Sequence, residues 1–117
     1  MKPKSTGWRS TNSHWFGHVT DLAAQYNAKY GTRFDKSGFA HFLRVEMAED
    51  DEWPGDVVTT RKGTPMFYPL AWSEADAALA NKAVDYCHAV ADREGFWLRE
   101  YGSLGVVEKQ WYGRPKP

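Results

Sequence analysis

Two histidines, His14 and His18, stand four positions apart in a segment with helical periodicity. Residues four apart lie on the same side of a helix, and this is the spacing at which two imidazoles bind one metal ion. The zinc-protease form of the motif requires Glu beside the first histidine, and Trp15 stands there instead. No third ligand is marked by its spacing. We therefore interpret the pair as the polar face of a helix and expect no metal site.

The single cysteine, Cys87, is followed directly by His88. Neighbours on a helix point about 100° apart, so this thiol and this imidazole do not form a nucleophile–base pair with each other. A lone cysteine excludes an intrachain disulfide and a multi-cysteine zinc site. Its place beside an apolar stripe predicts a small core residue. Since no phosphate-binding glycine loop or serine-nucleophile motif is present either, we expect neither an enzyme nor a cofactor.

The third candidate for chemistry is a run of four acids, Glu49, Asp50, Asp51 and Glu52. Carboxylates bind Ca²⁺ and Mg²⁺, but the run lacks the glycine-punctuated spacing of a calcium loop. We interpret it first as a solvated turn. Two other hypotheses stay open: an acidic face that docks a basic protein or mimics DNA phosphates, and a partner of a metal-dependent nuclease.

Charge is unevenly distributed along a chain whose 15 basic and 15 acidic residues cancel. Residues 1–36 hold six basic against two acidic side chains, and residues 109–117 hold three basic side chains and no acid. Residues 46–56 hold six acids and no base. A net charge of zero is a weak overall indication of DNA binding, but the basic ends suit phosphate contacts.

The spacing of apolar residues predicts the elements that position these side chains. Apolar residues at steps of four, three and four predict a helix from Asn12 to Tyr30, which Gly31 ends. A second helix is predicted from Ser37 to Ala48, with Ser37 as its N-cap. The sequence Trp53-Pro54-Gly55 prevents its continuation.

Two β-favouring runs around Lys62-Gly63 predict a hairpin over residues 56–71, whose second strand Pro65 and Pro69 place at an edge. A Ser73-led capping arrangement predicts a long helix to Glu94, followed by a short apolar run and an extended tail. The predicted fold class is α+β and mainly helical: two helices, a hairpin, a long helix and a short extended C-terminal tail.

The length of 117 residues predicts a single domain, with residues 1–8 and 113–117 as flexible ends. No apolar run approaches the roughly 20 residues of a membrane helix, and no signal peptide is indicated, so we expect a cytoplasmic protein without a membrane partner. Six Trp, six Tyr and six Phe supply large rings for a core, for stacking on nucleobases or for an interface.

Four stretches together resemble the NinB-type phage recombination proteins. That family has an Arg-Ser opening before its first long helix, a Lys- and Thr-containing strand region, a Ser-led helix with an acidic cap, and an acid-Gly pair before a hydrophobic residue. The corresponding stretches here are Arg9-Ser10-Thr11-Asn12-Ser13-His14-Trp15, Arg61-Lys62-Gly63-Thr64, Leu70-Ala71-Trp72-Ser73-Glu74-Ala75-Asp76 and Ala91-Asp92-Arg93-Glu94-Gly95-Phe96.

The resemblance implies a protein of a phage or prophage, acting in a bacterial host, that binds single-stranded DNA to assist recombination, often as a homodimer. Several residues suit that role physically. They lie at a helix N-terminus, where N–H groups attract phosphate, at the hairpin tip, or as rings next to basic residues. These candidate nucleic-acid-binding residues are Trp8, Arg9, Ser10, Asn12, Arg61, Lys62 and Trp111.

The alternative function belongs to another class: a small phage protein that binds and inhibits a host protein through the acidic run. Salt dependence separates the two hypotheses, because a phosphate binder loses affinity steeply as salt rises.

Overall fold

The computed structural model describes residues 11–101 and 107–112. Its elements in chain order are α1 (Thr11–Tyr30), α2 (Lys36–Glu49), β1 (Gly55–Thr59), β2 (Pro65–Pro69), the 3₁₀ turn η1 (Trp72–Glu74), α3 (Ala77–Glu94), β3 (Trp97–Tyr101) and β4 (Val107–Trp111). The order confirms the predicted α+β fold, mostly helical, with two helices, a hairpin and a long helix. Across these residues no helix combines the length and the apolar character needed to cross a membrane.

The two helices predicted to begin at Ser37 and Ser73 are capped by aspartates instead. Asp35 caps α2 and Asp76 caps α3, and each carboxylate accepts the backbone N–H three residues ahead, at 2.6 Å and 2.9 Å. Ser73 lies in η1, one turn before the helix proper. The prediction of these caps was wrong because Ser and Asp both suit an N-cap and several candidates stand within one turn.

Two glycines end helices as predicted. Gly31 follows α1 with φ of 70°, and Gly95 follows α3 with φ of 74°. Both lie in the left-handed region, which costs glycine nothing because it has no Cβ. The Gly31 N–H donates to Asn27 O at 2.9 Å, and the Phe96 N–H donates to Ala91 O at 2.9 Å. The chain therefore leaves both helices through hydrogen-bonded turns.

The core lies where α1 packs against α3 and β3, with α2 across α1. Its buried side chains follow the predicted stripes closely, and Cys87 is among them, as predicted. Tyr26, Leu79 and Tyr86 were expected inside and are only partly buried. The fully or nearly fully buried apolar side chains of the three helices include Trp15, Val19, Leu22, Phe39, Leu43, Met47, Ala83, Cys87, Val90 and Ala91.

A stack of three indole rings fixes the β1–β2 hairpin to the helices. Trp72 lies between Trp15 (centroids 4.6 Å apart, planes at 7°) and Trp53 (6.2 Å, 4°). Trp53 precedes β1 and Trp72 follows β2, so the stack holds both ends of the hairpin. The Trp53 Nε1–H also donates to Leu70 O at 2.9 Å, and the Trp72 Nε1–H donates to Asn12 Oδ1 at 2.9 Å.

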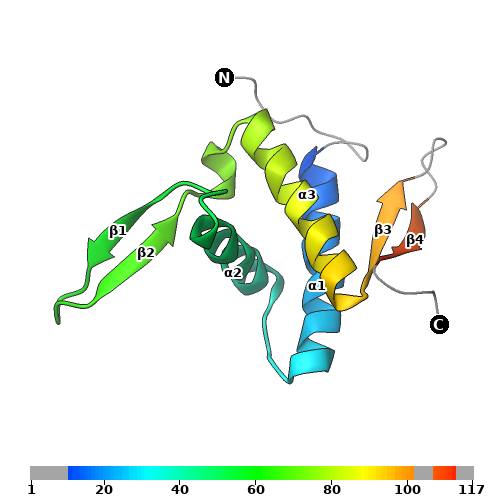
Figure 1. The fold of residues 1–117 in the computed structure, drawn as a ribbon, viewed down its shortest axis with the longest axis horizontal. Coiled ribbons are helices and arrows are strands. Elements are labelled where there is room, and N and C mark those ends of the chain that lie inside the picture. Colours follow the sequence, from blue (N-terminus) through cyan, green and yellow to red (C-terminus); the bar gives the residue numbers. More distant parts are fainter. Residues whose placement is uncertain (1–10, 102–106, 113–117) are drawn as a thin grey trace.

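The second hairpin was not fully predicted. The expected extended tail contains strand β4, which pairs antiparallel with β3, with Trp97 opposite Trp111. On α1, Gln25 and Asp21 bond to β3 much as a neighbouring strand would. Gln25 exchanges two hydrogen bonds with the Trp97 backbone (2.8 Å and 3.0 Å), and Asp21 accepts the Arg99 N–H at 2.9 Å. The two hairpins lie on opposite sides of the helices (Figure 1).

Candidate functional site

The β1–β2 hairpin projects from the helices as a two-stranded arm, called the ribbon below, residues 55–69 (Figure 1). All of β1 is exposed. Its turn runs from Thr60 to Thr64, where the Thr60 N–H donates to Thr64 O at 2.8 Å and Gly63 has φ of 86°. Arg61 and Lys62 lie in this turn with exposed side chains, as the sequence predicted for the hairpin tip.

Neither Arg61 nor Lys62 forms an ion pair with any residue in the described part of the chain. Along one face of the ribbon, cross-strand pairing sets Val58 opposite Met66 and Asp56 opposite Tyr68. Tyr68 is 52% exposed, and Met66 and Val58 are exposed to nearly the same degree. The ribbon thus joins a basic tip to an open face that carries an aromatic ring.

The other predicted DNA-binding residues do not gather at the ribbon. Trp8, Arg9 and Ser10 lie outside the described residues, and of Trp111 only the backbone is described, in β4. Asn12 lies at the start of α1, where its Oδ1 accepts the Trp72 indole N–H. Asn12 therefore has a structural role that the sequence did not indicate, and its helix, α1, lies apart from the tip of the ribbon (Figure 1).

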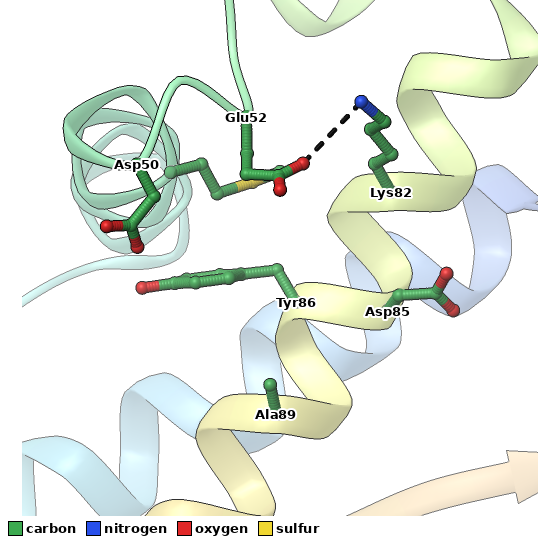
Figure 2. A pocket seen from close by; sticks show the side chains of 7 residues that line it. Asp50, Glu52, Lys82, Asp85, Tyr86 and Ala89 are labelled. Atoms are coloured by element: carbon green, nitrogen blue, oxygen red, sulfur yellow. Dashed lines mark ion pairs between the residues drawn. The ribbon is translucent and has the colours of Figure 1, made fainter.

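The acidic run ends α2 and continues into the loop before β1, and all four of its side chains are exposed. Asp50 and Glu52 line a groove of about 490 Å³ between the end of α2 and α3. Figure 2 shows Asp85 and Lys82 on the facing helix, with the Tyr86 ring between the two sides. Lys82 Nζ lies 3.5 Å from a Glu52 carboxylate oxygen.

This groove carries three carboxylates and one ammonium group, so its charge is net negative. Asp85 was missed by sequence reasoning, because it stands 35 positions from Asp50 on another helix. The Tyr86 hydroxyl donates to Glu46 Oε1 at 3.3 Å, and burial raises the pKa of both groups. The groove can accept a cationic side chain over an aromatic floor.

A third cluster lies between α1, α3 and β3. His18 is 0% exposed, which overturns the interpretation of His14 and His18 as a polar helix face. Its ring lies edge-on to that of His88, with centroids 5.0 Å apart, and His88 Nε2 lies 2.7 Å from Glu100 Oε1. One nitrogen of each histidine and one oxygen of Glu100 all lie within 4.8 Å of one another.

Sequence reasoning missed His88 and Glu100 as companions of His18. His88 was considered only with Cys87, which is buried in the core. Tyr112 joins the cluster from beyond β4, where its hydroxyl donates to Glu100 Oε1 at 2.9 Å. The one available signal was the buried stripe of α1, on which His18 falls between Trp15 and Leu22. Comparison of the chain with protein-family models, with curated proteins and with solved structures found no significant match.

Proposed function

We propose that the chain binds single-stranded DNA through the ribbon, in keeping with its resemblance to NinB-type recombination proteins. The observation that carries the proposal is the exposed basic pair Arg61 and Lys62 at the tip of a projecting arm whose open face bears Tyr68. Phosphates pair with the two cations at the tip, and unpaired bases further along the strand stack on the Tyr68 ring, which lies nearer the base of the ribbon. This is a binding role rather than catalysis.

The geometry favours a single strand over a duplex. Tyr68, Met66 and Val58 present apolar area along the ribbon rather than donors and acceptors for the edges of paired bases. Stacking tolerates any base sequence, since every base has a π-face. The tip of the ribbon projects away from α2 and α3, which line the acidic groove that would repel phosphate (Figure 1).

The test is fluorescence anisotropy of a labelled single-stranded oligonucleotide, titrated with protein at low and at moderate salt. We expect binding that weakens steeply with salt. The double variant Arg61→Ala/Lys62→Ala removes two phosphate contacts, so its log–log salt slope should flatten by about 1.4. Tyr68→Ser should cost about 1–3 kcal/mol without changing the slope, because it removes stacking and no charge.

The matched control is Arg33→Ala/Lys36→Ala, which removes the same charge from exposed positions outside the ribbon. It should bind nearly as the unmodified chain does. Absence of binding at low salt, where phosphate contacts are strongest, would count against the proposal. Equal losses of affinity in the two double variants would show that overall charge, and not the ribbon, determines DNA binding.

The acidic groove favours a second candidate function, the docking of a basic segment of another protein, such as a host protein that the chain inhibits. Asp50, Glu52 and Asp85 supply the charge and Tyr86 the aromatic surface. A labelled Arg-rich peptide is the probe. Charge reversal by Asp50→Lys/Asp85→Lys should abolish its binding, whereas the same reversal at exposed Glu74 and Asp92 should not. Equal effects of both reversals would overturn this second candidate.

A further inference from the structure

We propose that His18, His88 and Glu100 form a binding site for one divalent transition-metal ion, with Zn²⁺ as the best-suited ion. The three side chains come from α1, α3 and β3, and their nearest ligand atoms lie within 4.8 Å of one another. Two imidazoles and one carboxylate are a ligand set that zinc uses in proteins when it keeps a fourth position for water. The site is independent of the ribbon and of the acidic groove.

The strongest argument is the state of His18. Its side chain is completely buried, yet among the described residues neither Nδ1 nor Nε2 has a hydrogen-bond partner. A buried polar group without a partner costs about 1–3 kcal/mol, so such groups are rare in folded proteins. A metal ion bound at one ring nitrogen supplies the missing partner.

His18 is also in the chemical form that binds metals. Burial is the main cause that lowers the pKa of His18 to about 4, and the nearby Glu100 carboxylate opposes this shift. At neutral pH the ring is therefore uncharged and retains a nitrogen lone pair. An ion binding there displaces no proton from His18.

His88 and Glu100 are oriented as ligands usually are. His88 Nδ1 lies 3.0 Å from Val84 O, an arrangement in which Nδ1 carries the proton and Nε2 faces Glu100. Backbone carbonyls commonly fix the tautomer of a metal-binding histidine in this way. The Tyr112 hydroxyl holds the same Glu100 oxygen at 2.9 Å.

The distances suit an ion of this size. With Zn–N of about 2.0–2.1 Å, tetrahedral ligands lie about 3.3 Å apart, so the cluster must contract by about 1.5 Å at most. The His88 and Glu100 side chains are 33% and 23% exposed, which leaves them room to rotate and gives the ion access from solvent. Imidazole and carboxylate ligands in this number favour Zn²⁺ over Ca²⁺ or Mg²⁺, which require more oxygen ligands.

The experiment titrates the metal-stripped full chain with Zn²⁺ in competition with a chromogenic chelator. In parallel, Co²⁺ is added and its visible absorption recorded, because the spectrum reports the coordination geometry. We expect one bound ion per chain, an intense absorption typical of four-coordinate Co²⁺, and a rise in melting temperature on adding Zn²⁺, since the folded state alone holds the complete site.

The variants assign the ligands. His88→Ala and Glu100→Gln should each weaken Zn²⁺ binding by at least about 100-fold, beyond the loss seen when only an outer-shell partner is removed. The control His41→Ala, an exposed histidine on α2, should bind as the unmodified chain does. His18→Leu replaces an unsatisfied buried ring with an apolar side chain, so it should fold without metal and lose the ion.

Several results would overturn the site. One is the absence of stoichiometric Zn²⁺ binding, and another is full affinity in His18→Leu or His88→Ala. A third is loss of binding in His14→Ala with retention in His88→Ala, which would move the ion to the pair of histidines on α1. If His18→Leu does not fold, the partly exposed His88 and Glu100 still decide the outcome, because their variants leave the core intact.

Discussion

Arg99 on β3 and Asp21 on α1 are joined by their side chains and also through the backbone of the strand. Arg99 Nε lies 3.0 Å from Asp21 Oδ1, and the Arg99 N–H donates to Asp21 Oδ2 at 2.9 Å. Asp21 is 5% exposed, whereas the Arg99 side chain is 42% exposed. The pair therefore fixes β3, and the Glu100 that follows Arg99, to the first helix.

This asymmetry in burial predicts an asymmetric cost. Among the described residues, Arg99→Ala leaves the buried Asp21 carboxylate with only a backbone N–H, so we expect a loss of about 3–5 kcal/mol. Asp21→Asn keeps an acceptor for the backbone N–H and frees an arginine that can reach water, which should cost about 1–2 kcal/mol. Urea unfolding of both variants measures the difference. An equal or smaller cost for Arg99→Ala would contradict the inferred burial of the charge.

The indole stack predicts that Trp72 controls the attachment of the ribbon. Trp72→Ala removes the middle ring between Trp15 and Trp53 and should destabilise the chain by about 3 kcal/mol. Amide hydrogen exchange across residues 55–69 should accelerate more than exchange in α3, because the ends of the ribbon lose their common support. Tyr68→Ala, an exposed aromatic on the ribbon itself, is the control. A uniform change over all elements would show that the ribbon has no special dependence on Trp72.

The hydrogen bonds of the Glu94 carboxylate predict that the fold loses stability in acid. Burial raises its pKa, but hydrogen bonds from Lys29 (2.6 Å), Tyr30 (2.6 Å) and Arg93 (3.2 Å) outweigh burial and lower the pKa to about 2. A carboxylate with a depressed pKa stabilises the fold fully above its unfolded value, near 4.5, and the contribution disappears as the pH falls towards 2.

The measurement is the melting temperature from about pH 6 to about pH 2. This range spans both the unfolded and the folded pKa of Glu94. Glu94→Gln should be less stable at pH 6, by about 1–3 kcal/mol for hydrogen bonds to a charged group, and should show a smaller further loss in acid. Glu74→Gln, an exposed position, should follow the unmodified chain. If the melting temperatures of Glu94→Gln and of the unmodified chain fall in parallel with pH, Glu94 does not cause the loss of stability in acid.

The thiol of Cys87 should not react with thiol reagents while the chain is folded. It is 0% exposed, and burial raises its pKa, so neither access nor the reactive thiolate is available. A thiol reagent should label it only at the rate of unfolding, and labelling should rise steeply through the urea transition. Rapid labelling without denaturant would show that α3 opens locally around Cys87.

The sequence predicted elements better than it predicted their junctions. Apolar periodicity placed α1 within one residue of its observed start, and Gly31 and Gly95 marked helix ends, because local geometry alone determines both features. The caps at Asp35 and Asp76 were missed because neighbouring serines satisfy the same chemistry. The pairing of β4 with β3, and the bonds of β3 to Gln25 and Asp21 on α1, join residues far apart in the sequence, which no local pattern encodes.

The candidate sites also differ in how far the sequence could predict them. Arg61 and Lys62 were predicted together because a short turn sets their position. Lys82 and Asp85 in the groove, and His88 and Glu100 beside His18, come together only after the helices pack. The spacing of residues along one helix can indicate two ligands on that helix. It cannot indicate ligands such as His88 and Glu100, which come from another helix and from a strand.

The prolines of β2 determine how the ribbon meets other chains. The Leu70 N–H donates to Pro54 O across the ribbon, so the alternate positions 65, 67 and 69 direct their backbone donors outward. Proline occupies two of these three positions and has no N–H, which leaves Phe67 as the single outward donor. A third strand therefore finds one N–H donor along this edge of β2, beside the carbonyl acceptors that the prolines keep. Edge-to-edge pairing of the projecting arm is thereby disfavoured on the β2 side, and the β1 edge, which has no proline, is the better template for an added strand.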